Sequence, residues 1–169
     1  MREQLAALHE ASFGWALACC GRDRELAADV LQDAYFKVLD GRAKYAGSSA
    51  FKTWLFGVIR LTATEHRRWG VLRFRRSKGA PESTDLEDPR RAPDSEAGAR
   101  ERAEQLAAAL SKLAERQREV LHLVFYDDLS IAEAAQVMGV SLGTARQHYD
   151  RGKHALANLL ASQTRTSQT

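Results

Sequence analysis

The sequence predicts an all-α protein with two small helical domains joined by a flexible linker. Apolar residues recur at steps of three and four over residues 5–69 and again over 106–160, which is the spacing of amphipathic helices. No run of useful length alternates apolar and polar residues as a half-buried strand would. All three prolines, Pro81, Pro89 and Pro93, fall between these two blocks. We therefore expect a first domain at 1–70, a linker at 71–98, a second domain at 99–161 and a polar tail at 162–169.

Three or four helices are expected in the first block. The first ends near Gly21, because glycine readily adopts the backbone conformation that ends a helix. The second begins after Asp23, whose carboxylate can cap it, and ends near Gly41. The third runs from Ala50 to about Trp69. Together they can bury a modest core.

The second block contains the pattern of a helix-turn-helix over residues 129–153. Ser130 and Glu133 have the spacing of a capping box, Gly139 permits a sharp turn, and Ser141 can cap the helix that follows. The face of this second helix opposite its apolar side carries Arg146, Gln147, Asp150, Arg151 and His154. Such a helix can enter the major groove of DNA and reach base edges. An ordinary helical hairpin in an all-α core is the alternative interpretation.

The positive charge is concentrated in one segment. The whole chain has a net charge of only +3, but residues 51–78 hold eight Lys or Arg residues and a single acid, Glu65. Residues 1–50 and 79–99 are both net negative. A basic segment between acidic neighbours indicates contact with a polyanion at a defined place. A solvated surface is the alternative interpretation.

The predicted helix over 51–69 also interleaves aromatic with basic residues. Aromatic rings stack on unpaired bases at about 1–3 kcal/mol per base, and nearby cations neutralise the phosphates. For Phe51 and Trp54, periodicity alone leaves core packing and nucleic-acid contact equally open.

Several other classes of protein are disfavoured. No apolar run approaches the roughly 20 residues of a membrane span, and the N-terminus lacks a signal-peptide pattern. The adjacent Cys19 and Cys20 suit small core residues in a reducing cytoplasm better than a metal pair or a disulfide. The five histidines form no metal-spaced set, and no catalytic motif stands out. We expect a cytoplasmic protein that is not an enzyme and binds no cofactor or metal.

Five motifs, in order, resemble those of the sigma-70 family in its extracytoplasmic-function group, which keeps only regions 2 and 4. The resemblance covers 5–69 and 109–160 and rests on Asp29-Val-Leu-Gln-Asp33, Ser49-Ala-Phe-Lys-Thr-Trp-Leu-Phe-Gly-Val-Ile59, Leu113-Ala-Glu-Arg-Gln-Arg-Glu-Val-Leu121, Leu129-Ser-Ile-Ala-Glu-Ala-Ala135 and Gly143-Thr-Ala-Arg146.

This resemblance implies an alternative sigma factor that brings RNA polymerase core to promoters. Its region 4 would read the −35 element with Ser141, Thr144, Arg146, Gln147, His148 and Arg151. Its region 2 would open the −10 element with Lys52, Trp54, Phe56, Arg60, Leu61, Arg67 and Arg68. Core polymerase would be bound at Asp29, Gln32, Asp33 and Phe36. The implied partners are the β′ clamp and β flap of the core, promoter DNA and an anti-sigma factor, and the free protein is expected to be a monomer that touches no membrane.

The chain departs from the family pattern at two places. Family members commonly carry Asn where this chain has Leu61, which cannot hydrogen-bond an extruded base. In the recognition helix, residues 147–150 are less basic than usual, and Asp150 can pair with Arg146 or His154. An unusual −35 preference is therefore expected. No regulatory domain is expected after region 4.

The competing hypothesis is a helix-turn-helix regulator that acts without polymerase, which would need a dimer to read a palindrome.

Overall fold

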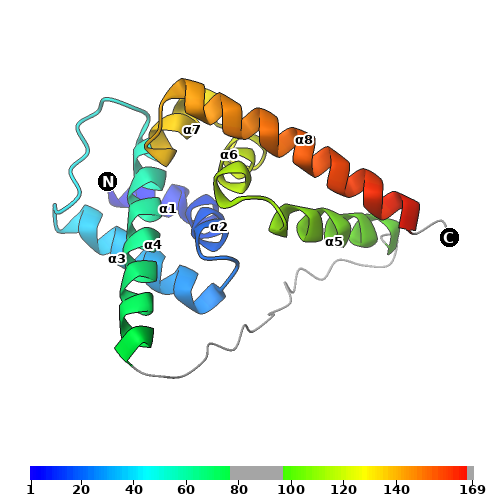
Figure 1. The fold of residues 1–169 in the computed structure, drawn as a ribbon. Coiled ribbons are helices and arrows are strands. Elements are labelled where there is room, and N and C mark those ends of the chain that lie inside the picture. The colour runs from blue at the N-terminus through cyan, green and yellow to red at the C-terminus, as the bar shows by residue number, and fades with distance from the viewer. Residues whose placement is uncertain (77–96, 167–169) are drawn as a thin grey trace.

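The computed structural model describes residues 1–76 and 97–166, and this part of the chain forms helices and no strand, which confirms the all-α prediction (Figure 1). The helices are α1 (Arg2–Ala7), α2 (His9–Cys19), α3 (Arg24–Leu39), α4 (Phe51–Arg76), α5 (Ala97–Ser111), α6 (Glu115–Phe125), α7 (Ile131–Met138) and α8 (Leu142–Thr166). We call residues 1–76 the N-terminal half and 97–166 the C-terminal half.

The first expected helix is two helices in the structure. A break at Leu8 separates α1 from α2, so the apolar spacing continues across a change in backbone direction. The next helix begins as predicted, because the Asp23 carboxylate accepts a hydrogen bond from the Leu26 backbone N–H at 3.0 Å. Gly21, ahead of that cap, has a positive φ of 63°.

Helix α4 is longer than the sequence indicated. It continues to Arg76, past the expected domain boundary at residue 70. A single Gly70 costs about 1 kcal/mol in a helix, and the Leu and Arg residues that follow it favour helix formation. Residues 77–96 of the expected linker lie outside the described residues. At the other end of the chain, α8 includes residues 162–166 of the expected polar tail.

The core of the N-terminal half is built around Trp15, which is fully buried. Its indole Nε1 donates a hydrogen bond to the Phe56 carbonyl at 3.0 Å, and the two rings stack with centroids 5.9 Å apart. This bond satisfies the one polar atom of the indole inside the core. Cys19 and Cys20 are also buried free thiols, as the sequence indicated, and burial raises the pKa of Cys20 to about 11.

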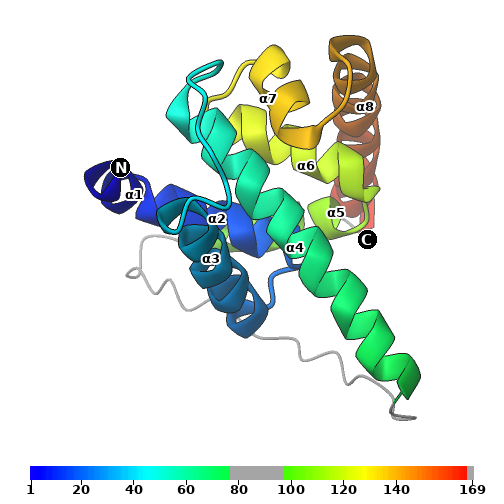
Figure 2. The same ribbon diagram turned by 90° about the vertical axis from the view of Figure 1, so that its left-hand side faces the viewer.

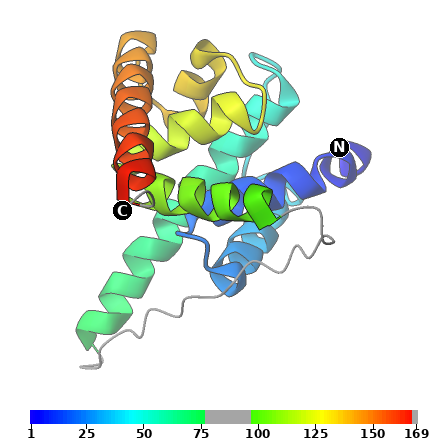
Figure 3. The same cartoon turned by 90° about the vertical axis from the view of Figure 1, so that its right-hand side faces the viewer.

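The C-terminal half contains the predicted helix-turn-helix. Ser130 and Glu133 form the full capping box, and Gly139 ends α7 with a left-handed φ of 64°. The Ser141 hydroxyl accepts a hydrogen bond from the Thr144 N–H at 3.1 Å at the start of α8. Helix α5 lies across the later turns of α8 (Figure 3). The local signals in the sequence therefore place both helices of the motif correctly.

The two halves share one hydrophobic core. Helix α4 lies between α2 and α3 on one side and α6 and α7 on the other (Figure 2). Buried Leu123 and Met138 of the C-terminal half belong to the same cluster as Trp15 and Ile59 of the N-terminal half. One face of α4 is consequently covered by the C-terminal half.

Candidate nucleic-acid and polymerase-binding surfaces

The first turns of α8 present an exposed polar surface. Arg146, Gln147 and Arg151 are all exposed, and Ala145, on the opposite side, is fully buried. His148 is only half-buried. The helix dipole at the start of α8 adds a partial positive charge to this surface. A surface of this kind suits the edge of a DNA groove.

Ser141 and Thr144 lie at the N-terminus of α8 and are engaged with each other. Their hydroxyl oxygens are 2.9 Å apart, in addition to the cap that Ser141 makes. A phosphate could still accept a hydrogen bond from one of these hydroxyls, close to the free N–H groups of the helix end. Further along, His154 Nδ1 lies 2.7 Å from the backbone carbonyl oxygen of Asp150. The predicted pairing of these two residues is therefore made through the backbone of Asp150 and not through its carboxylate. Lys153, which is not among the residues predicted from the sequence, lies over the Tyr149 ring at 5.1 Å.

A second group of predicted residues lies on the face of α4 that meets the C-terminal half. Lys52 donates to the Asp127 carbonyl at 2.7 Å. Arg60 Nε lies 3.0 Å from Glu119 Oε1. Arg67 pairs with Glu115. Phe56 is fully buried against Trp15, which differs from the expectation that it lies near an opened DNA strand.

The remaining face of α4 is free and carries the other predicted residues. Leu61 is 61% exposed, Arg68 is exposed and Trp54 is half-buried. Trp54 packs with Phe51 and Tyr45 in a three-ring cluster whose centroids are 5.1 to 5.4 Å apart. For Trp54, the structure therefore combines packing with partial exposure.

Two aromatic residues near this face were not selected from the sequence. Tyr45 lies in the loop before α4, where its hydroxyl donates to the Ser49 carbonyl at 2.6 Å. Because Tyr45 lies in a loop, the helical periodicity of the sequence could not indicate it. Trp69, which follows Arg68 on α4, is 68% exposed. The sequence offered one signal for this residue, a tryptophan directly after Arg67 and Arg68 in the basic segment.

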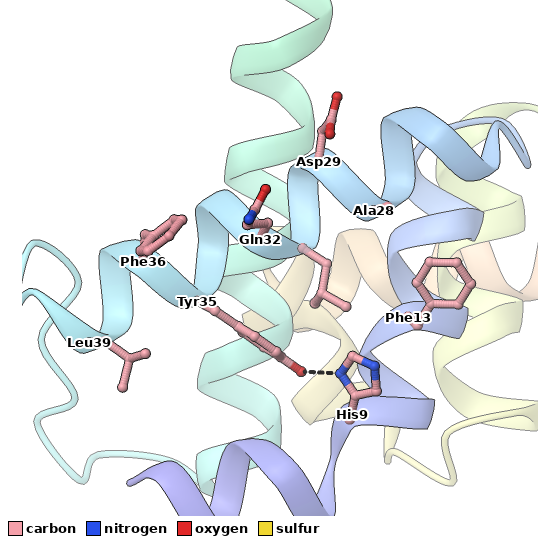
Figure 4. Close-up of a pocket in the computed structure, with 9 residues that line it drawn as sticks. His9, Phe13, Ala28, Asp29, Gln32, Tyr35, Phe36 and Leu39 are labelled. Carbon is pink, nitrogen blue, oxygen red and sulfur yellow. Dashed lines mark hydrogen bonds between the residues drawn. The ribbon is translucent and has the colours of Figure 1, made fainter.

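A third surface lies along α3. Asp29, Gln32 and Phe36 are exposed there, and Phe36 leaves 54% of its surface in solvent. Asp33 Oδ2 is 2.7 Å from His66 Nε2 of α4. Between α2 and α3 runs a groove of about 500 Å³ (Figure 4). It is lined by His9, Phe13, Ala28, Asp29, Leu31, Gln32, Tyr35, Phe36 and Leu39. The single carboxylate of this lining, Asp29, lies beside apolar side chains, which fits a partner helix that presents basic and apolar residues.

Both halves of the chain match known families. The sigma-70 region 2 model matches residues 7–69, and the sigma-70 region 4 model matches residues 103–156. The RNA polymerase sigma-H factor of Pseudomonas aeruginosa is 30% identical over 154 residues, which cover 82% of this chain and 75% of that protein. The extracytoplasmic-function (ECF) sigma factor SigX of Bacillus subtilis is 29% identical over 137 residues, covering 80% of this chain and 71% of that protein.

The chain belongs to the sigma-70 family, in its extracytoplasmic-function group.

It is accordingly an alternative sigma factor of RNA polymerase, with α2–α4 in region 2 and α6–α8 in region 4. A solved structure of the sigma factor RpoE in complex with the anti-sigma factor NepR, from Bartonella quintana, has the same fold. The TM-score is 0.76 at 22% identity, over 95% of this chain and 96% of that one. CnrH in complex with the cytosolic domain of CnrY matches with a TM-score of 0.63 at 24% identity, over 95% and 87%.

Two other kinds of feature are absent from the part of this sigma factor that the structure describes. In residues 1–76 and 97–166, no three His, Cys, Asp or Glu side chains gather in a way that could hold a metal ion. Within the same residues, no helix is both long and apolar enough to span a membrane. The polar surfaces of α3, α4 and α8 therefore remain the candidate sites.

Proposed function

We propose that this sigma factor directs RNA polymerase core to promoters through three surfaces, one each on α3, α4 and α8. The observation that supports this most directly is the exposed Arg146, Gln147 and Arg151 surface on the second helix of a helix-turn-helix, in a chain that also carries region 2. A regulator that works without polymerase would have no use for region 2. We place the protein in the cytoplasm, because bacterial transcription takes place there, and as a monomer when free.

The α8 surface would read the −35 element. Arg146 and Gln147 have the side chains that make bidentate contacts with guanine and adenine edges in the major groove. Arg151, just over a turn further along, and the half-buried His148 would contact the same DNA. Ser141 and Thr144 would hold the backbone phosphate at the helix N-terminus.

The α4 surface would hold the opened −10 element. Trp54 offers a partly exposed ring for stacking, and Arg68 offers a charge for the backbone beside it. Leu61 presents an apolar surface and suits a contact that requires no hydrogen bond. Lys52 and Arg60 would bind phosphates once the C-terminal half no longer covers them, and the exposed Arg67 would do so once it separates from Glu115. We assign Phe56 to the core that supports α4 and not to DNA.

The α3 surface would bind the β′ clamp of core polymerase. One side of this helix carries Asp29, Gln32, Asp33 and Phe36, all of them exposed, and the Asp33 carboxylate also contacts His66. Region 4 would bind the β flap.

An anti-sigma factor is a further proposed partner. The two structural relatives named above were solved with anti-sigma factors bound. Because this chain shares their fold, we propose that an anti-sigma factor covers the α3 surface and so competes with core polymerase.

The test is run-off transcription with purified core polymerase, this protein and a pool of promoter fragments. New start sites that appear only when core and protein are both present would support the proposal and identify the promoter elements. Binding of the protein alone to duplex DNA, with no change in initiation by core, would instead favour the regulator that works without polymerase.

A further inference from the structure

A polar contact joins the proposed core-binding surface of α3 to α4. Nε2 of His66, on α4, lies 2.7 Å from Oδ2 of Asp33, on α3. An ionised carboxylate only accepts hydrogen bonds, so the imidazole Nε2 is the donor. Helices α3 and α4 pack against each other here (Figure 2). His66 is not among the residues predicted from the sequence, in which it stands 33 positions after Asp33.

A second polar contact lies one turn further along α3 and one turn back along α4. Lys37 Nζ donates a hydrogen bond to Thr62 Oγ1 at 3.1 Å and also pairs with Glu65. Lys37 follows Asp33 by four residues, and His66 follows Thr62 by four residues, which is the spacing of neighbours on one helix face. The two contacts hold α3 and α4 in one register. The meeting of Asp33 and His66 therefore does not depend on one flexible pair alone.

Asp33 stays available to a partner while His66 holds it. The Asp33 side chain is 52% exposed, whereas the His66 side chain is 25% exposed. The contact uses Oδ2, and an ionised carboxylate has about four acceptor sites on its two oxygens. A cation of a partner can therefore bind the same carboxylate without displacing the imidazole.

The contact restricts the Asp33 side chain before any partner arrives. An exposed aspartate without such a neighbour moves among several rotamers, and a partner that binds it must remove this freedom. The loss of freedom on binding lowers the affinity of a complex. Because the His66 donor already restricts Asp33, part of this loss has occurred in the free protein. An exposed pair of this kind adds little to folding stability, so its main effect is expected in binding.

We propose that His66 is a positioning residue for the binding of core polymerase, and that its Nε2–H holds the Asp33 carboxylate in the orientation that a cation of the core binds. This inference rests on the proposed role of α3 in binding core polymerase. It adds a residue of α4 to that surface. Region 2 would then build its core-binding surface from two helices and not from α3 alone.

Two substitutions of His66 separate positioning from packing. His66→Phe keeps an aromatic ring and removes the donor. His66→Gln loses the ring, but its amide nitrogen can take nearly the same place as the imidazole Nε2 and donate to Asp33. Biolayer interferometry with the whole chain and purified core polymerase gives the affinity of each variant. Circular dichroism shows whether each variant keeps its helices.

His66→Phe should weaken core binding about threefold, which is the scale of effect expected when one side chain must be ordered on binding. His66→Gln should bind core nearly as tightly as the unsubstituted protein. In the background of Asp33→Ala, His66→Phe should cause no further loss, because the group that His66 orients is absent. This double-mutant cycle is the matched control for effects of His66 that do not pass through Asp33.

Several results would overturn the positioning role. Unchanged affinity of His66→Phe would do so, and so would an equal loss with and without the Asp33 carboxylate. Tighter binding by His66→Phe would mean that His66 competes with core for Asp33. A loss in His66→Gln as large as the loss in His66→Phe would assign His66 to packing. If His66→Phe loses its helical circular dichroism, His66→Asn replaces it, because the shorter amide ends near the Nδ1 position and does not reach Asp33.

Failure of the proposed core-binding surface is seen separately. If Asp29→Ala weakens core binding and Asp33→Ala does not, Asp33 is no contact and the positioning role is wrong, while the surface on α3 stands. If neither variant weakens binding, the surface itself is wrong, and the role of His66 is wrong with it.

Discussion

Gly152 of α8 lies directly against Leu121 of α6. A Cβ at Gly152 would be 3.2 Å from Leu121 Cδ1 and 3.2 Å from the Cβ of Gln117. Few real Cβ atoms come so close to a neighbour. The close approach of α6 and α8 at this point therefore depends on Gly152 having no side chain. The recognition helix is thereby held at a fixed position on the rest of region 4.

Gly152→Leu should therefore destabilise the protein. Overpacking of a well-packed site costs about 1–3 kcal/mol. The gain of up to about 1 kcal/mol from removing a helix glycine offsets only part of this. The midpoint of urea unfolding measures the effect. Gly143→Ala is the control, because its nearest neighbour is Ser141 Oγ at 3.9 Å, and it should leave stability unchanged or raise it by up to about 1 kcal/mol through the gain in helix propensity.

The capping box of α7 gives a prediction that depends on pH. Glu133 Oε2 accepts hydrogen bonds from the Ser130 N–H at 2.9 Å and from its hydroxyl at 2.7 Å, and these lower the pKa of Glu133. Ser130→Ala should cost about 0.5–2 kcal/mol at neutral pH, as loss of an N-cap does. A carboxyl with a lowered pKa stabilises the folded state above its unfolded pKa and loses that contribution as the pH falls through its folded value. The cost of Ser130→Ala should therefore shrink in acid.

The measurement is the melting temperature of both proteins at pH 7 and below about pH 4. Ser141→Ala is a matched control, because Ser141 also caps a helix but its hydroxyl bonds Thr144 and no carboxylate. Its cost should be the same at both pH values. An equal cost for Ser130→Ala at both values would contradict the role given to Glu133.

The helix caps at Ser130 and Ser141 illustrate what the sequence could predict. The capping box, the turn at Gly139 and the cap at Ser141 depend on residues three or four apart, and local chemistry decides them. These local signals were sufficient to predict the all-α class and the helix-turn-helix. The end of α4 was harder, since only Gly70 suggested a stop and tertiary context outweighs one glycine.

The contacts of α4 could not be predicted in the same way. Arg60 pairs with Glu119, 59 residues further along the chain, and no periodic pattern connects such positions. Trp54 and Phe56 are two residues apart, so they point to nearly opposite sides of the helix, one partly exposed and one buried. Periodicity shows that α4 has distinct faces, but only the packing of both halves shows which face is covered.

On α3, Asp29→Ala and Phe36→Ala should each weaken binding to core polymerase without affecting the fold. Both side chains are exposed, so each substitution should change stability by no more than about 0.5 kcal/mol. Loss of a contact worth about 1.4 kcal/mol weakens binding about tenfold. Biolayer interferometry with purified core measures this. Glu3→Ala, which removes an exposed acid from α1, is the control, and equal affinity of all three variants would contradict the clamp assignment.

On α8, Arg146→Ala and Gln147→Ala should alter promoter choice and not only promoter strength. A bidentate contact with a base edge discriminates by about 1–3 kcal/mol against the wrong base. Run-off transcription from templates with each −35 base changed in turn should show reduced discrimination at one or two positions for each variant. Asn158→Ala, exposed three turns further along α8, should keep the normal pattern. If every template instead lost activity by the same factor, Arg146 and Gln147 would be contacting phosphates, because backbone contacts carry no sequence information.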